Sequence, residues 1–141
     1  QPVLTRRCVV DKVNMDRARI ITTEAAEQCA RTALPEIQPL TPLTQLLKNW
    51  PANRLLYFAD ELGGTPALQA FTEAASGLTE AQMPAALLIG PEGGFDDAER
   101  AAIRAHPCAR PISLGPRILR AETAAIVALA LWMGMAGDWK K

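Results

Sequence analysis

Residues 85–105, A-A-L-L-I-G-P-E-G-G-F-D-D-A-E-R-A-A-I-R-A, predict a strand that runs through a glycine-rich loop into a helix. The first five residues form an unbroken apolar run, which is typical of a strand covered on both faces. Gly90-Pro91-Glu92-Gly93-Gly94 interrupts that run. Asp96 followed by Glu99 has the spacing of a capping box. We therefore expect the helix to begin after Asp96 and to extend to about Ala105.

The same alternation of strands and helices extends outward in both directions. Amphipathic spacing predicts helices over 16–31, 42–50 and 66–75, and an almost wholly apolar stretch predicts another from Ala121 onward. A compact apolar run predicts a strand over 54–59, and further short strands are predicted over 36–38 and 111–114. This alternation indicates an α/β fold, a mostly parallel sheet flanked by helices. Ligands of such sheets bind beyond the carboxyl ends of the strands. The loops 90–94 and 115–120 occupy that position.

The composition excludes several classes of protein. The 141 residues predict one domain with one core, and 49% hydrophobic with 21% charged residues is typical of a globular chain. Fifteen basic residues balance fifteen acidic ones, so any contact with nucleic acid must come from a local patch. One histidine and three separated cysteines argue against a metal site or a disulfide framework. The longest apolar run, 124–136, is shorter than the roughly 20 residues of a membrane span. We expect no membrane contact and a cytoplasmic location.

The second loop is unusual for a plain connection. Residues 114–124, L-G-P-R-I-L-R-A-E-T-A, place Ile118 and Leu119 between two arginines, and a Glu-Thr pair then opens a helix. Taken alone, the apolar pair could belong to the core, Glu122 could stabilise the helix dipole and Arg120 could face solvent. A lone glycine-rich loop is equally typical of a tight turn. Two such loops about twenty residues apart favour a ligand site.

These motifs resemble a known family. G-P-E-G-G-F-x-x-x-E and L-G-P-R-I-L-R-A-E-T-A are similar to the C-terminal part of the RsmE-type 16S ribosomal RNA uridine N3-methyltransferases, of the SPOUT superfamily. The strong match covers about residues 85–137, and a weaker one, E-Q-C-A-R-x-x-x-P-E-I, covers 27–37. The resemblance implies a C-terminal trefoil knot, a homodimer and S-adenosylmethionine bound between the knot's loops. It assigns the cofactor to Leu88, Ile89, Gly90, Gly94, Leu114, Gly115, Ile118, Leu119 and Thr123.

The chemistry of that reaction guides the choice of catalytic residues. Uracil N3 carries a proton that must leave, and negative charge then spreads onto O2 and O4. Arg120 is our first candidate for stabilising that charge or for binding phosphate, because guanidinium is a planar fork of donors. Glu122 and Glu92 are candidates for the base or for an orienting group. Arg31 is a candidate for reaching substrate, unless it only forms an ion pair with Glu27 four residues before it.

The expected partners are 16S ribosomal RNA, or the small ribosomal subunit, and a second copy of the chain, with no metal. Candidate phosphate contacts, which could equally form a solvated charged face, are Arg6, Arg7, Arg17 and Arg19. Candidate interface residues on the final helix, which could equally be ordinary core, are Ile126, Leu129 and Trp132.

Family members also carry an N-terminal β-barrel domain resembling PUA modules, and no such segment is found in this chain. We therefore expect residues 1–141 to be a SPOUT methyltransferase domain that is incomplete at its N-terminus. Three alternatives remain: a SPOUT enzyme acting on another RNA, a truncated non-catalytic module for cofactor binding or dimerisation, and an unrelated nucleotide-binding domain that uses the glycine-rich loop for phosphate.

Overall fold

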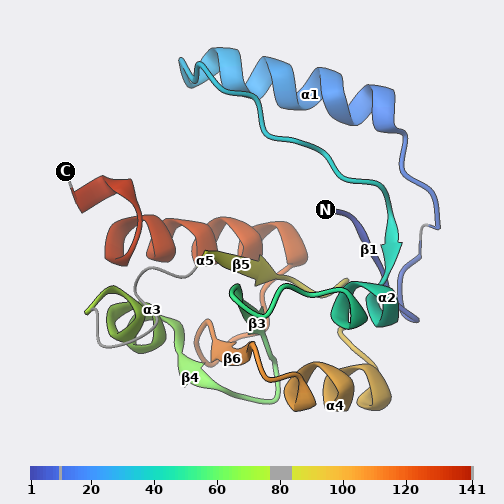
Figure 1. Cartoon of the computed structure of the whole chain (residues 1–141), viewed down its shortest axis with the longest axis vertical. Coiled ribbons are helices and arrows are strands. Elements are labelled where there is room, and N and C mark those ends of the chain that lie inside the picture. The colour runs from blue at the N-terminus through green and yellow to red at the C-terminus, as the bar shows by residue number, and fades with distance from the viewer. Residues whose placement is uncertain (10, 77–83, 141) are drawn as a thin grey trace.

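The computed structural model describes residues 1–9, 11–76 and 84–140 (Figure 1). The helices are α1 (Met15–Gln28), α2 (Leu43–Lys48), α3 (Ala67–Ala75), α4 (Asp97–Ala105) and α5 (Ala121–Met135), with a short 3-10 helix, η1 (Asp138–Lys140). The strands are β1 (Val3–Leu4), β2 (Thr41–Pro42), β3 (Leu55–Ala59), β4 (Thr65–Pro66), β5 (Ala85–Leu88) and β6 (Ala109–Ser113). Strands and helices alternate, as the sequence predicts, except that β4 follows β3 with no helix between them.

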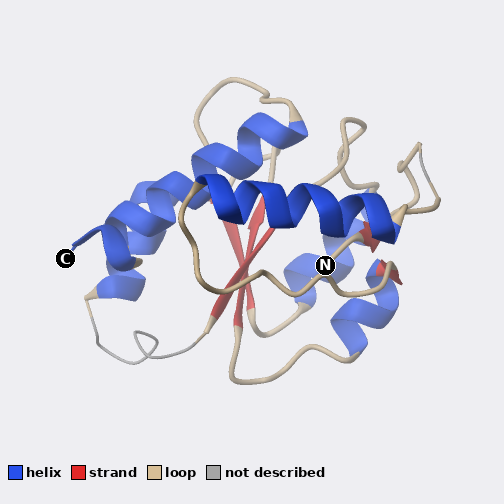
Figure 2. Ribbon diagram, turned by 90° about the horizontal axis from the view of Figure 1, so that it is seen from above, coloured by secondary structure: helices blue, strands red, loops and turns tan. Residues whose placement is uncertain are grey.

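The main sheet is parallel and has the strand order β4-β6-β3-β5. Helices cover both of its faces, as Figure 2 shows. A second, two-stranded parallel sheet joins β1 to β2. This arrangement confirms the predicted α/β class with a parallel sheet between helices. The trefoil knot implied by the resemblance stays a prediction.

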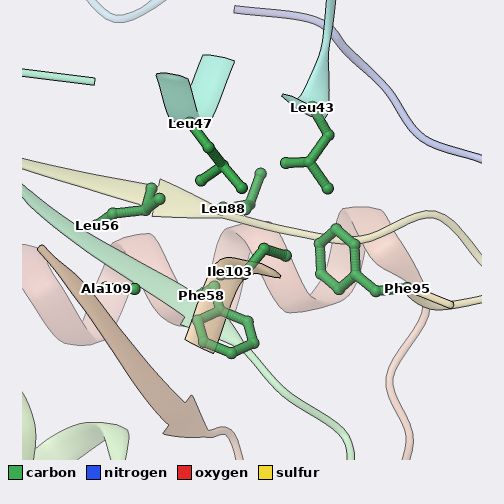
Figure 3. Close-up of a cluster of buried hydrophobic side chains, with 8 residues drawn as sticks. All are labelled: Leu43, Leu47, Leu56, Phe58, Leu88, Phe95, Ile103 and Ala109. Atoms are coloured by element: carbon green, nitrogen blue, oxygen red, sulfur yellow. The ribbon is translucent and has the colours of Figure 1, made fainter. Parts of the chain in front are cut away.

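Alternation along β3 divides the core into two halves. Successive side chains of a strand point to opposite faces, and all four residues of Leu55–Phe58 are buried. Leu56 and Phe58 pack with residues of α2 and α4 on one face (Figure 3). Leu55 and Tyr57 pack with α3 and α5 on the other. The central strand is therefore fixed from both sides, and the loop that follows it starts from a rigid position.

The strand register brings three loops to one edge of the sheet. Phe58 of β3 lies opposite Leu88 of β5 and Pro111 of β6. All three strands are parallel, so their carboxyl ends point the same way. The chain segments that leave β3, β5 and β6 consequently emerge side by side.

Three sequence-based predictions of elements need correction. No strand forms at 36–38, because this segment pairs with no other strand; the pairing occurs at β2, where the Thr41 N–H bonds the Pro2 carbonyl at 3.2 Å. The first helix ends at Gln28 instead of Arg31, because Ala30 adopts a left-handed φ of 53°. β6 begins at Ala109, before the predicted 111. β5 is an edge strand whose residues 85–87 are only partly buried, although Ala86 packs against one half of the core and Ala85 and Leu87 pack against the other.

In the part of the chain that the structure describes, no helix combines the length and the apolar character that crossing a membrane would require.

Candidate functional site

A pocket opens beyond the carboxyl ends of β3, β5 and β6. Its walls are the ends of these strands and the segments that follow them. The lining residues are Ala59 at the end of β3 with Asp60 and Glu61 after it; Ile89, Gly90, Pro91, Glu92, Gly94 and Phe95 after β5; and Ser113 at the end of β6, Leu114, Gly115, Pro116, Arg117, Ile118 and Leu119 in the loop after it, and Ala121 and Ala124 of α5. Both glycine-bearing loops therefore meet in one pocket, where the parallel-sheet argument predicts a ligand.

The glycine-rich loop after β5 is tightly closed. The Gly94 N–H donates to the Pro91 carbonyl at 2.8 Å, and Gly94 has a φ of +66°. A Cβ at Gly94 would overlap the carboxylate of Glu61. Only glycine meets both requirements without strain. The next residue, Phe95, is buried in the core and anchors the end of the loop.

The predicted capping box is confirmed at the start of α4. Asp96 Oδ1 accepts from the Glu99 N–H at 2.7 Å, and Glu99 Oε2 accepts from the Asp96 N–H at 3.1 Å. The bond from the Glu99 N–H, with a smaller contribution from the Arg6 guanidinium, holds the pKa of Asp96 below its ordinary value. The carboxylate of this cap stays ionised at neutral pH, and its negative charge stabilises α4 by its interaction with the positive end of the helix dipole.

The N-terminal segment is bonded to the glycine-rich loop after β5 and to the start of α4. The Arg6 N–H donates to Glu99 Oε1 at 2.8 Å, and the Arg6 guanidinium lies 3.0 Å from Asp96 Oδ2. Arg7 Nη1 donates to the Gly93 carbonyl at 2.8 Å. Both arginines were candidates for phosphate contacts. The structure gives each a protein partner, so a phosphate contact would have to use their remaining N–H groups.

An ion-pair cluster joins the loop after β3 to α4. The Asp60 carboxylate is buried, and it accepts from Arg100 Nε at 3.1 Å and from Arg104 Nε at 2.9 Å. Arg100 Nη2 also lies 2.7 Å from Glu61 Oε1. A buried carboxylate without such partners would be strongly destabilising. The cluster fixes the part of this loop that faces the pocket.

The loop after β6 presents apolar side chains to solvent. Gly115 has a φ of +114°, Ile118 is 88% exposed and Leu119 is partly buried. The Arg120 carbonyl accepts from the Ala124 N–H at 2.8 Å, so Arg120 is the N-cap of α5 while its side chain is exposed. An exposed isoleucine in a pocket wall suits contact with an apolar ligand group.

The structure brings together most of the predicted cofactor residues. Those that line the pocket are Ile89, Gly90, Gly94, Leu114, Gly115, Ile118 and Leu119. Leu88 is buried in the core beneath the loop, and Thr123 is exposed in the first turn of α5, beside the lining residue Ala124.

Of the four catalytic candidates, one lines the pocket, two are next to a lining residue in the sequence, and one lies away from the lining segments. Glu92 lines it. Arg120 and Glu122 are exposed and flank the lining residue Ala121. Arg31 is exposed, lies just beyond α1 and is not among the lining residues. Their roles stay predictions.

Sequence reasoning missed the acidic pair Asp60-Glu61 and the lining residue Arg117. A signal was present, because Asp60 and Glu61 directly follow the apolar run R-L-L-Y-F-A. The rule that placed the site beyond the strand ends applies to this strand as well. No group of three or more potential metal-ligating side chains occurs in the described ranges.

Comparison with known proteins agrees with this architecture. The family model of the RNA methyltransferase domain matches residues 1–133. Ribosomal RNA small subunit methyltransferase E of Rickettsia conorii is 34% identical over 129 residues, which are 92% of this chain and 50% of that protein. The protein of the same name from a Synechocystis species is 36% identical over 136 residues, 92% of this chain and 42% of that protein. The chain thus spans about half the length of these curated relatives.

Two solved structures with S-adenosylmethionine bound are also similar. A putative methyltransferase of Legionella pneumophila is 33% identical, with a TM-score of 0.72, over 94% of this chain and 53% of that one. A ribosomal RNA small subunit methyltransferase E of Neisseria gonorrhoeae is 25% identical, with a TM-score of 0.83, over 99% of this chain and 55% of that one. The family match extends over nearly the whole chain and over all three loops of the pocket, and on this evidence the chain belongs to the RNA methyltransferase domain family.

Proposed function

We propose that this chain binds S-adenosylmethionine in the three-loop pocket and transfers its methyl group to ribosomal RNA of the small subunit. The observation that carries the proposal is the meeting of loops 90–94 and 115–119 in one pocket. Similar structures hold S-adenosylmethionine. When bound, this group supplies a methyl on a sulfonium, which transfers in line to a nucleophile.

The pocket residues suit this ligand. Gly115 lets a ligand approach the main chain, since it has a φ of +114° and open space where a side chain would lie. Ile118 and Leu119 offer apolar surface for a flat base. Glu92 and Arg117 supply charged groups on the same walls. The mixture of apolar walls and few polar groups is typical of small-molecule sites.

For the target atom we propose N3 of a uridine, on the strength of the resemblance of the two loop motifs. Arg120 would stabilise negative charge on O2 or O4, or would bind phosphate, and its exposed side chain is accessible to RNA. Glu122 or Glu92 would accept or orient the N3 proton. Arg31 does not line the pocket, so it would contact the RNA outside the pocket or reach the pocket of a partner chain. N3 lies on the pairing edge of uracil, so the target base must be unpaired or flipped out.

We also propose that the chain works as a homodimer in the cytoplasm and forms the catalytic domain of a longer enzyme. Ile126 and Leu129 of α5 are exposed, whereas Trp132 packs against Tyr57 and Phe71 in the core. The single chain therefore leaves part of the predicted interface uncovered. Exposed Arg17 and Arg19 on α1 offer further positive charge to RNA, although Arg19 is paired with Asp16.

The first test is calorimetric titration of S-adenosylmethionine and S-adenosylhomocysteine into the chain, with ATP as the control. We expect one site per chain for both ligands and none for ATP. Binding of ATP in their place would favour the unrelated nucleotide-binding alternative. No binding of any of the three by a folded chain would contradict the cofactor site.

The second test is methyl transfer from labelled S-adenosylmethionine to small ribosomal subunits that lack their own uridine N3 methylation, followed by mass spectrometry of nuclease digests. We expect N3-methyluridine in the small-subunit RNA and none in transfer RNA or large-subunit RNA. Cofactor binding without transfer would indicate the non-catalytic module. Methylation at another atom or in another RNA would contradict the N3 assignment.

A further inference from the structure

Glu61 is an acidic residue of the pocket that neither loop motif contains. It lies in the loop after β3, lines the pocket and has a side chain that is 40% exposed. We propose that the Glu61 carboxylate binds the ribose hydroxyls of the nucleoside ligand. This inference rests on the proposed cofactor function and adds a recognition residue to it.

The carboxylate is held in one position by the protein. Its Oε1 atom lies 2.7 Å from Arg100 Nη2, and Arg100 is itself nearly buried. Arg100 Nε is fixed in turn by the buried Asp60 at 3.1 Å. A guanidinium anchored at both ends orients the carboxylate before any ligand arrives. Such preorganisation reduces the entropic cost of binding.

The second carboxylate oxygen is available for a ligand. Among the described residues, none donates a hydrogen bond to Glu61 Oε2, while Oε1 is engaged by Arg100. The carboxylate also lies against Gly94, since a Cβ at that position would overlap it. The Glu61 carboxylate therefore fills the space beside Gly94 and meets the glycine-rich loop at the wall of the pocket.

The local charge favours neutral donors over a cation. Asp60 and Glu61 carry two negative charges, and Arg100 and Arg104 balance them in the same cluster. Asp97 lies 3.6 Å from Arg100 Nη1 but is fully exposed, so water and salt screen its charge. A second cation beside Glu61 would meet the guanidinium of Arg100. Vicinal hydroxyls donate without adding charge, and acidic side chains near the ends of parallel strands bind ribose hydroxyls in other α/β folds.

The test is a double-mutant-type thermodynamic cycle, in which removal of the Glu61 carboxylate is combined with removal of one ribose hydroxyl from the ligand. S-adenosylhomocysteine, its 2′-deoxy form and its 3′-deoxy form are titrated calorimetrically into the wild-type chain and into Glu61→Gln. Asp97→Asn is the matched control, because it also removes a carboxylate from Arg100 but does not line the pocket. Glu61→Asp is the second variant, which keeps the charge but withdraws the carboxylate by one methylene. Thermal unfolding of each variant verifies that it is folded.

We expect Glu61→Gln to weaken S-adenosylhomocysteine about 10- to 100-fold, the range for a hydrogen bond to a charged group. Glu61→Asp should show a loss in the same direction, and Asp97→Asn should bind like the wild type. At least one deoxy ligand should bind the wild type weakly and be insensitive to Glu61→Gln. An equal loss for hydroxyl and deoxy ligands, or no loss at all, would overturn the inference while leaving the cofactor site intact. Absence of S-adenosylhomocysteine binding by the wild type would overturn both proposals.

Discussion

Gly94 shows how a single backbone position shapes the pocket. Its φ of +66° and the nearby Glu61 carboxylate leave neither the conformation nor the space for a side chain. We expect Gly94→Ala to lower stability by roughly 1 to 3 kcal/mol from backbone strain and to weaken binding of S-adenosylhomocysteine as the loop shifts. Gly63→Ala is the control, since Gly63 also has a positive φ, 109°, but open space around it.

Thermal unfolding and calorimetry measure the two effects separately. Gly63→Ala should lose stability from strain alone and keep its affinity for the ligand. If both alanine variants bound S-adenosylhomocysteine like the wild type, the close approach at Gly94 would have no part in the site.

Asp96 gives the stability of the chain a defined dependence on pH. The Glu99 N–H, and then Arg6, hold its pKa in the folded chain below the ordinary value of 3.8. A depressed pKa stabilises the fold above the unfolded value, and this contribution disappears as the pH falls through the folded pKa. Asn also caps helices but does not titrate. We expect the difference in melting temperature between the wild type and Asp96→Asn to be constant near pH 6 and to shrink below pH 3.8.

Melting curves from pH 6 downward measure this difference, with Asp11→Asn as the control at an exposed acidic residue outside the helices. If the difference in melting temperature between the wild type and Asp96→Asn stayed constant down to the lowest pH, the ionised Asp96 carboxylate would not be the source of the stabilisation.

At the scale of elements, Asp60 connects the sheet to α4. It follows the central strand β3 and is paired with Arg100 and Arg104, both from the helix. Removing the Asp60 charge takes away the carboxylate partner of Arg104 and one of the three carboxylate partners of Arg100, and losing a partner in a buried cluster costs about 3 kcal/mol. We expect Asp60→Asn to lower the free energy of unfolding by that amount in denaturant titrations.

Asp16→Asn is the matched control for Asp60. It removes the carboxylate of an exposed pair with Arg19 at 3.1 Å, and such pairs contribute roughly 0 to 1 kcal/mol. If both substitutions lowered the free energy of unfolding equally, the buried ion pairs of Asp60 would stabilise the contact between β3 and α4 no more than an exposed pair does.

Local patterns predicted the elements well, because the forces that define them act within a few residues. The capping box of α4 needs only Asp96 and Glu99, and both bonds form. The strand predicted at 36–38 fails because pairing depends on a partner distant in sequence: β2 pairs with the N-terminal β1. The exposure of β5 likewise depends on its place at the sheet edge, which its own apolar run does not reveal.

The site was predictable where one loop carries its own signal, and hidden where distant segments cooperate. The glycine-rich loop and Ile118-Leu119 line the pocket as expected. Glu61 has its position fixed by Arg100, thirty-nine positions away in the chain, and Gly93 is held by Arg7. No spacing rule links such residues. Arg31, chosen as a candidate for reaching substrate, does not line the pocket, and its role stays a prediction.

At the scale of the whole molecule, α5 leaves apolar surface uncovered. Ile126 is 68% exposed and Leu129 53% exposed. Leu129 also lines an apolar groove between α5 and β5, together with Ala125 and Trp132. Figure 1 shows α5 beside β5, the edge strand of the sheet. A second copy of the chain is the proposed cover for this surface, and it would bury what the single chain exposes.

The double substitution Ile126→Asp with Leu129→Asp tests this cover. Both side chains are exposed in the single chain, so the fold should tolerate the change, while charge inside an apolar interface would prevent association. We expect the wild type to sediment as a dimer at micromolar concentration and the variant as a folded monomer. Leu68→Asp, at a similarly exposed position on α3, should remain dimeric. A wild-type monomer, or a variant that still dimerises, would show that this face of α5 is not the interface.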